Sequence, residues 1–337
     1  KAGDSDAASA LKRVTGLTLV DGRFIFVRGL GERYSCTLLN SANVPSPDPT
    51  RRVVPLDLFP AAIIDSIAVQ KSVTPEMPAE FGGGTVQIRT KSVPEAAFFN
   101  VEAKLGYNSQ TTGKEGLDYL GGGSDWTGKD DGTRAMSPLL MEATADGTQI
   151  REFNRFTGVG YTKEELELIG ESLPVNYQVT PKNISPNVGF GAAGGTRYQL
   201  TEDIAIGFLA ALDYDDKYLT TEQQRTNYVV SGGELIPENS YTYLITGRKI
   251  DLGAFVTAGA EFGDDHSLSY NYMQLRSTTD RTQEQEGFNR DAEGGDIKIT
   301  ELEWIERQLE AHQLFGDHVI PALWDFQLDW NYTTATA

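Results

Sequence analysis

The residues that could do chemistry in this 337-residue chain are few and widely spaced. Its histidines, His266, His312 and His318, have no metal-ligating spacing with one another or with the single cysteine, Cys36. No nucleophile elbow, phosphate-binding loop or dinucleotide fingerprint occurs. Carboxylates are abundant, but abundance alone does not make an acid–base pair. We therefore predict no enzymatic activity, no cofactor, and no catalytic or metal-binding residue.

One acidic, glycine-rich stretch, residues 121–132, contains Asp125, Asp130 and Asp131 and could bind a cation. Its spacing matches no EF-hand loop. A solvated loop is the favoured interpretation, because charge runs usually lie in solvent.

Composition restricts the class of protein. The net charge of −19 argues against a nucleic-acid partner, which would require clustered Lys and Arg. No run approaches the roughly 18 apolar residues of a membrane helix, but strands that cross a membrane give only a weak hydropathy signal. The 35 glycines, 14 tyrosines and 15 phenylalanines suit a β-rich chain. The first four residues have no apolar signal region, so we expect a processed or truncated start if the protein is exported.

Residues 67–91 are predicted to position the rest of the first domain. Two runs, 67–70 and 86–90, alternate apolar and small or polar residues, as half-buried strands do. Prolines in the connecting loop prevent a regular ladder there. Three consecutive glycines, Gly82, Gly83 and Gly84, permit positive φ and the close approach of another backbone.

This stretch, IAVQKSVTPEMPAEFGGGTVQIRTK, resembles the plug-domain signature of TonB-dependent outer-membrane receptors. Residues 24–40, FIFVRGLGERYSCTLLN, resemble the hydrophobic-Arg-Gly block of that family, with Ser41 where a glycine is usual. Residues 45–60, PSPDPTRRVVPLDLFP, resemble a block of a large subgroup. Three blocks in order are far more specific than one glycine cluster.

The resemblance implies roles for individual residues. Plug arginines of the family contact glutamates on the inner barrel wall, and the matching plug–barrel contacts here are Arg28, Lys71, Glu80 and Arg89, with Lys71 in place of the more usual Arg. The structural plug motif comprises Gly29, Gly82, Gly83 and Gly84. The candidate ligand contacts at the plug apex are Arg33, Tyr34, Arg51 and Arg52. For the last two, local pairing with Asp48 or Asp57 is the favoured alternative.

Within the predicted plug, an amino-terminal helix should end near Gly16. The expected small core comprises Leu56, Leu58, Phe59, Ile63, Ile64 and Ile67.

From residue 94 the chain repeats long alternating segments, about seven in all, the last beginning at Trp324. Runs of ten or more residues exceed ordinary sandwich strands and suit a tilted crossing of a bilayer. Connections at 201–203, 263–266 and 316–322 are short; those at 110–183, 230–240 and 286–296 are longer. This asymmetry is typical of outer-membrane barrels. Tyr107, Tyr198, Trp304 and Trp330 fit aromatic girdles, and residues 162–173 should form a helix with a capping box.

We therefore predict a mainly β chain: an α+β plug domain at 1–93, then part of a transmembrane antiparallel barrel at 94–337, with a long extracellular loop at 110–183. Because seven strands leave open edges in lipid, and family members close with 22, the resemblance implies the first third of a barrel. The TonB box of the family would lie upstream of Lys1.

The function implied is import of a scarce nutrient (an iron chelate, a cofactor or an oligosaccharide) across the outer membrane of a Gram-negative bacterium. The implied partners are outer-membrane lipid, the periplasmic TonB energy-coupling protein, the small-molecule or oligosaccharide ligand, and a surface lipoprotein or other envelope protein. A plugged barrel that serves as a docking subunit of a larger assembly is the alternative. A soluble β-rich binding module is the third hypothesis, which the long apolar strands disfavour.

Overall fold

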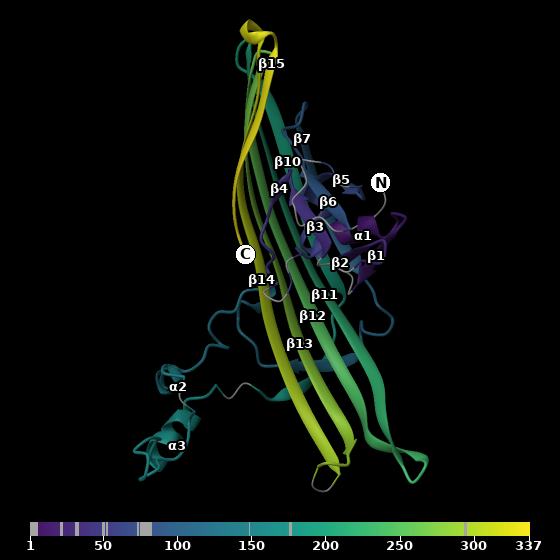
Figure 1. The fold of residues 1–337 in the computed structure, drawn as a ribbon, viewed down its shortest axis with the longest axis vertical. Coiled ribbons are helices and arrows are strands. Elements are labelled where there is room, and N and C mark those ends of the chain that lie inside the picture. The colour runs from purple at the N-terminus through teal and green to yellow at the C-terminus, as the bar shows by residue number, and fades with distance from the viewer. Residues whose placement is uncertain are drawn as a thin grey trace.

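The computed structural model describes residues 6–20, 23–30, 34–48, 51, 53–72, 74, 83–147, 149–174, 177–292 and 295–337. A small α+β domain lies against one face of a large antiparallel sheet (Figure 1). The predicted fold class is therefore confirmed. Within the described residues, no helix is long and apolar enough to cross a membrane.

The small domain is an assembly of short elements. They are α1 (Ala7–Leu11), β1 (Leu17–Val20), β2 (Phe24–Val27), β3 (Ser35–Leu39), β4 (Ala42–Asn43), η2 (Leu56–Leu58), η3 (Ala61–Ile63), β5 (Ile64–Gln70) and β6 (Gly84–Thr90). Strands β3 and β6 pair in parallel at the centre of a four-stranded sheet ordered β4-β3-β6-β5, and β1 and β2 form a separate antiparallel pair. The turn between β3 and β4 forms although Ser41 replaces the usual glycine, because both Asn40 (φ 48°) and Ser41 (φ 68°) adopt positive φ.

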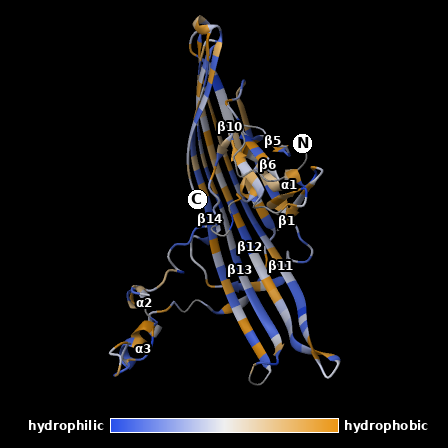
Figure 2. Cartoon of the chain, in the orientation of Figure 1, coloured by the Kyte–Doolittle hydropathy of each residue, from blue (hydrophilic) through white to orange (hydrophobic). Residues whose placement is uncertain are grey.

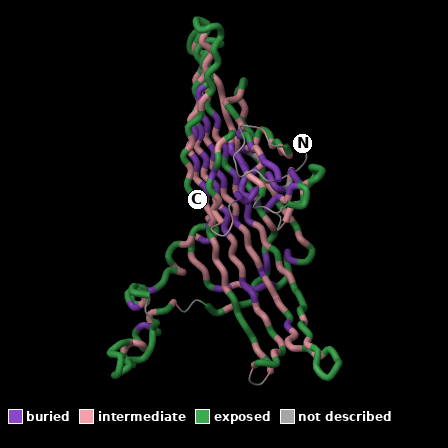
Figure 3. The backbone as a smooth tube through the Cα atoms, in the orientation of Figure 1, coloured by how far each residue is buried: buried purple, intermediate pink, exposed green. Residues whose placement is uncertain are grey.

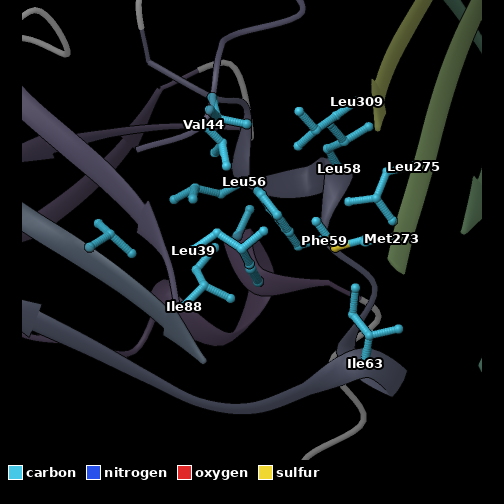
Figure 4. Close-up of a cluster of buried hydrophobic side chains, with 14 of the residues drawn as sticks. Leu39, Val44, Leu56, Leu58, Phe59, Ile63, Ile88, Met273, Leu275 and Leu309 are labelled. Carbon is cyan, nitrogen blue, oxygen red and sulfur yellow. The ribbon is translucent and has the colours of Figure 1, made fainter. Parts of the chain in front are cut away.

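The core of the small domain lies where the sequence predicts it. Leu56, Leu58, Phe59 and Ile63 are at most 5% exposed, and the predicted members Ile64 and Ile67 pack against them partly buried. The core does not end at the domain. Met273, Leu275 and Leu309 of the large sheet close it from the other side (Figure 4). The two parts of the chain therefore share one hydrophobic core.

The large sheet, here called the wall, contains seven strands ordered β15-β14-β13-β12-β11-β10-β7. They are β7 (Phe98–Gly106), β10 (Asn187–Gln199), β11 (Ile204–Ser231), β12 (Glu234–Phe262), β13 (His266–Asn289), β14 (Asp296–Ile320) and β15 (Phe326–Thr336). All neighbours are antiparallel. The predicted boundary at 93/94 falls in the connection between β6 and β7, and the division into domains stays a prediction.

Two predicted features of the wall are wrong. The expected long connection at 230–240 is a two-residue hairpin, Gly232-Gly233, in which both residues have positive φ. A glycine pair relieves the steric cost of that turn, so the ladder continues to its tip. Trp324 does not begin the last strand; after the short helix η5 (Pro321–Leu323) it lies in the turn before β15, at φ 58°, and is 97% exposed.

The connection between β7 and β10, here called the long loop, has structure of its own: β8 (Glu115–Tyr119), η4 (Asp125–Thr127), α2 (Pro138–Thr144), α3 (Lys163–Glu171) and β9 (Val179–Asn183). The predicted helix is confirmed as α3. Its capping box is present, because the Thr162 hydroxyl accepts from the Glu165 amide while the Glu165 carboxylate accepts from the Thr162 amide.

The two faces of the wall can be told apart from the register. Directly opposed residues of antiparallel strands share a face. Lys249, Gly253 and Met273 lie on the face that contacts the small domain, which we call the inner face. Buried residues gather on this side, where the small domain covers the strands (Figure 3).

The opposite, outer face carries apolar side chains on six of the seven strands, which we call the apolar band; on β14 the same face carries His312, Leu314, Gly316 and His318. The underlying alternation is visible in Figure 2. The apolar band comprises Phe99, Val101, Ala103 and Leu105 on β7; Val188, Phe190 and Ala192 on β10; Ile204, Ile206, Phe208, Ala210, Leu212 and Tyr214 on β11; Ile250, Leu252, Ala254, Val256, Ala258, Ala260 and Phe262 on β12; Leu268, Tyr270 and Tyr272 on β13; and Phe326, Leu328, Trp330 and Tyr332 on β15. On β11 the series spans residues 204–214, which matches the roughly 9–11 residues of a transmembrane strand. The series ends at Tyr214. The next residue on the same face, Asp216, is charged and forms a two-point ion pair with Arg248.

Candidate functional site: the interface between the small domain and the wall

An ion pair joins the small domain to the inner face of the wall. The Lys249 ammonium lies 2.7 Å from the Asp57 carboxylate in η2 and 3.2 Å from the Asp251 carboxylate. The Arg23 guanidinium approaches Asp57 from within the small domain, at 3.8 Å. The Asp57 side chain is only 12% exposed, so its charge requires these partners. Because an ammonium and a carboxylate at this distance form a charge-assisted hydrogen bond, the pair fixes η2 to β12.

A second attachment is made of neutral groups. The Asn40 amide donates to the Gln313 side-chain oxygen at 2.7 Å, and the Gln313 amide donates to the Leu39 carbonyl at 3.1 Å. Next to it, the Asn271 amide donates to the Thr90 hydroxyl at 3.3 Å. These groups lie near the short turns of the wall, whereas Lys249 lies further along the strands. The small domain is therefore held at two separate levels.

A polar cavity of about 460 Å³ lies beside the second attachment. Residues of both domains line it, among them Asp65, Arg89 and Lys91 from the small domain and Asp317 and Asp329 from the wall. Its mixed charges and hydroxyl groups can hydrogen-bond water or a polar solute. The described residues contain no group of three or more metal-ligating side chains, and in the acidic loop Asp125 and Asp130 both bind Arg134.

The residues predicted to make plug–barrel contacts lie in different parts of the structure. Arg89 lines the cavity between the domains. Lys71 donates to the Thr15 carbonyl inside the small domain. Arg28 is exposed in a turn with φ 54°, where its amide donates to Gly16, and it pairs with no carboxylate of the described chain. Glu80 lies outside the described residues.

The glycine motif serves close packing. A Cβ on Gly84 would lie 2.8 Å from Val27 Cγ1, and one on Gly83 would lie 3.1 Å from Leu30 Cδ1. The Gly83 amide donates to the Tyr34 carbonyl at 2.7 Å. Gly29 has φ 80° in the turn after β2. Gly82 lies outside the described residues. The glycines thus allow β6 to begin directly against β2.

Of the predicted ligand contacts, Tyr34 and Arg51 can be placed. Tyr34 is 46% exposed and precedes β3 at the end of the small domain opposite Asn40 and Thr90, so it faces away from the short turns of the wall. The Arg51 guanidinium stacks 4.2 Å from the centroid of the Phe24 ring. Arg33 and Arg52 lie outside the described residues, so their grouping with Tyr34 and Arg51 stays a prediction.

Beyond the small domain, the inner face continues as a polar surface along the long strands. The Arg281 guanidinium binds Glu301 and Glu303 at 3.0 and 2.9 Å, and the Arg225 guanidinium lies 5.4 Å from the Tyr243 ring centroid. Hydroxyl and amide groups, including Thr221, Gln223, Gln283 and Gln285, lie on the same face. Such a surface can hydrogen-bond a polar ligand.

The sequence predicted no role for Lys249, Gln313 or Asn271. It suggested Asp57 only as a local partner of Arg51 or Arg52. A signal for Lys249 exists, since an inward lysine in a run of alternating apolar residues requires an acidic partner. No local signal identifies that partner, because Asp57 is 192 positions away.

No family model and no curated protein matches the chain. It is similar to solved structures titled copper transporter OprC (12% identity, 98% of this chain and 53% of that one, TM-score 0.29) and ferric citrate transporter FecA without ligand (11%, 99% and 57%, 0.29). It is also similar to a mutant ferric enterobactin receptor, PfeA, from Pseudomonas aeruginosa (12%, 99% and 55%, 0.30). The chain spans about half the length of each.

Proposed function

We propose that this chain is the plug and adjoining wall of a TonB-dependent receptor in the outer membrane of a Gram-negative bacterium. One observation carries the proposal. The domain with the glycine signature packs on the inner face of a wall whose outer face is the apolar band. A wall that is apolar outside, polar inside and closed by a small domain is suited to a gated passage through lipid.

The proposed activity is energy-dependent import of a scarce nutrient. The ligand binds from outside, between the plug apex and the polar inner face of the long strands. Tyr34 and Arg51, with Arg33 and Arg52, are the proposed plug contacts. Force applied through the amino-terminal segment by a TonB-type protein then rearranges the plug. The amide of Ala7 donates to the Phe59 carbonyl next to η2, so this segment is already attached to the element that carries Asp57.

The ligand class remains part of the proposal: an iron chelate, a cofactor or an oligosaccharide. Cells that produce the full-length protein, and matched cells that lack it, should be given labelled members of each class. We expect one class to bind to the producing cells and to enter only when the inner membrane is energised. Binding without energy-dependent uptake would instead favour the docking-subunit function. No binding by any class, with the protein correctly assembled, would count against a nutrient receptor.

A further inference from the structure

The long loop is seated on the outer face of the wall rather than over the plug. The Leu117 amide donates to the Thr246 hydroxyl at 2.8 Å, and the Thr278 hydroxyl donates to the Gly128 carbonyl at 2.5 Å. Thr246 and Thr278 belong to the face opposite Lys249 and Met273. A Cβ on Gly128 would lie 2.9 Å from the Thr278 hydroxyl oxygen, so the backbone of the loop touches the strands directly.

The part of this loop that reaches furthest toward the apolar band is η4. The Tyr214 hydroxyl donates to the Trp126 carbonyl at 2.8 Å. Tyr214 is the last apolar-band residue on β11, and the next position on that face, Asp216, pairs with Arg248. The loop therefore meets the wall at the border between its apolar and charged surfaces.

At this border the loop exposes large apolar side chains. Trp126 is 63% exposed and Leu120 is 75% exposed. The segment between them is fixed, because the Gly122 amide donates to the Asp125 carboxylate at 3.0 Å and that carboxylate binds Arg134 at 2.7 Å. The Arg134 guanidinium in turn lies 3.9 Å from the centroid of the Trp304 ring on β14. Trp304, predicted as a girdle residue, is thus under the loop and not on the lipid surface.

We propose that residues 120–127 form an interfacial membrane anchor, in which Trp126 and Leu120 insert among the outer-leaflet lipids beside the wall. The inference rests on the proposed membrane location and goes beyond the proposed transport. Continuity with the apolar band selects lipid as the occupant, since the lipid that covers Phe208 and Leu212 reaches Tyr214 and therefore Trp126. Indole rings favour this depth because they are apolar with one hydrogen-bond donor.

Spin-label accessibility tests this location. In the full-length protein carrying Cys36→Ser, single labels are placed by Trp126→Cys and, separately, Leu120→Cys, whose exposed side chains leave no buried gap. Phe208→Cys marks the apolar band. Phe156→Cys, 92% exposed on the same loop between α2 and α3, is the matched control. Each variant is reconstituted in phosphatidylcholine vesicles, and collisions with oxygen and with a water-soluble nickel chelate are compared.

We expect oxygen collisions to exceed nickel collisions at positions 208, 126 and 120, and the reverse at position 156. Labels at 126 and 120 that behave like the label at 156, while 208 remains in lipid, would overturn the anchor and leave the proposed function intact. A label at 208 that is itself open to nickel would overturn the membrane location and the anchor together. The two failures are therefore distinguishable.

Discussion

The ammonium of Lys249 lies 2.7 Å from the carboxylate of Asp57, and this pair joins the wall to the small domain with the charges reversed from those expected. The resemblance predicted plug cations and wall carboxylates. In the structure the small domain supplies the carboxylate, from η2, and the wall supplies the cation, from β12. The Ala7 amide donates to the carbonyl of Phe59, directly after η2, so the amino-terminal segment is hydrogen-bonded close to this pair.

Lys249→Met and Asp57→Asn should each weaken docking of the small domain on the wall by about 1.5–3 kcal/mol, the range for hydrogen bonds to charged groups. The double variant should cost less than the sum, because the two changes remove one shared interaction. Protease cleavage of the small domain across a urea series measures the free energy of its docking. Lys182→Met is the control: its pair with Asp118 has the same 2.7 Å distance but is more exposed, so it should cost about 0–1 kcal/mol. Strict additivity would refute the coupling.

Gln313→Ala should destabilise the second attachment by about 1–3 kcal/mol, because it removes the side-chain donor to the Leu39 carbonyl and one of the two acceptors of the Asn40 side-chain amide, the other being the Thr90 hydroxyl. Hydrogen exchange of β3 and β4 should accelerate, and η2 should be unaffected. Gln285→Ala, further from the short turns on the inner face, is the control. The same cleavage and exchange measurements on this variant show the effect of losing a glutamine that does not contact the small domain. If hydrogen exchange in β3 did not change, the second attachment would have no role in holding the small domain.

Gly84→Ala should destabilise the small domain by about 1–3 kcal/mol, since the new methyl group would lie 2.8 Å from Val27 Cγ1 in a packed interior. Val27→Ala in the same molecule should recover part of that loss by making room. Gly247→Ala, in β12 with no atom nearer than 3.9 Å, should be close to neutral. Thermal unfolding of the three variants is the measurement. Equal effects of Gly84→Ala and Gly247→Ala would exclude a packing requirement at the glycine motif.

Docking of the long loop should depend on pH through Asp280, which lies beyond the apolar band on the outer face. Burial raises the pKa of Asp280 to about 6, although Arg134 and Arg248 oppose the rise; Tyr119 and Asp125 also face it. A raised carboxyl pKa stabilises the docked loop at low pH, and this stabilisation is lost as the pH rises through about 6. We expect docking to weaken by on the order of 1 kcal/mol between about pH 5 and pH 7.

Asp280→Asn should abolish that dependence and strengthen docking at neutral pH. A dye attached through Phe156→Cys, on the Cys36→Ser background, can report release of the loop in urea at each pH. An unchanged pH slope in Asp280→Asn would assign the effect to another carboxylate.

The sequence was sufficient for features that depend on local pattern. Alternation predicted about seven long strands, apolar spacing placed the core at Leu56, Leu58 and Phe59, and Thr162 with Glu165 placed α3. It failed where glycines decide chain direction, as at the Gly232-Gly233 hairpin. It also failed where the partner is remote. Register across several strands, which no single segment encodes, brings Lys249 to Asp57 and Gln313 to Asn40.

The most direct test of whether the wall is embedded in lipid compares two leucines of β11 in the full-length protein. Leu212 and Leu219 are 56% and 54% exposed, but Leu212 lies on the outer face and Leu219 on the inner face. The free energy of folding into lipid vesicles should be measured for Leu212→Arg and Leu219→Arg. If the apolar band faces lipid, Leu212→Arg costs about 2–4 kcal/mol and Leu219→Arg costs close to nothing. Equal costs for the two variants would contradict the membrane-embedded wall.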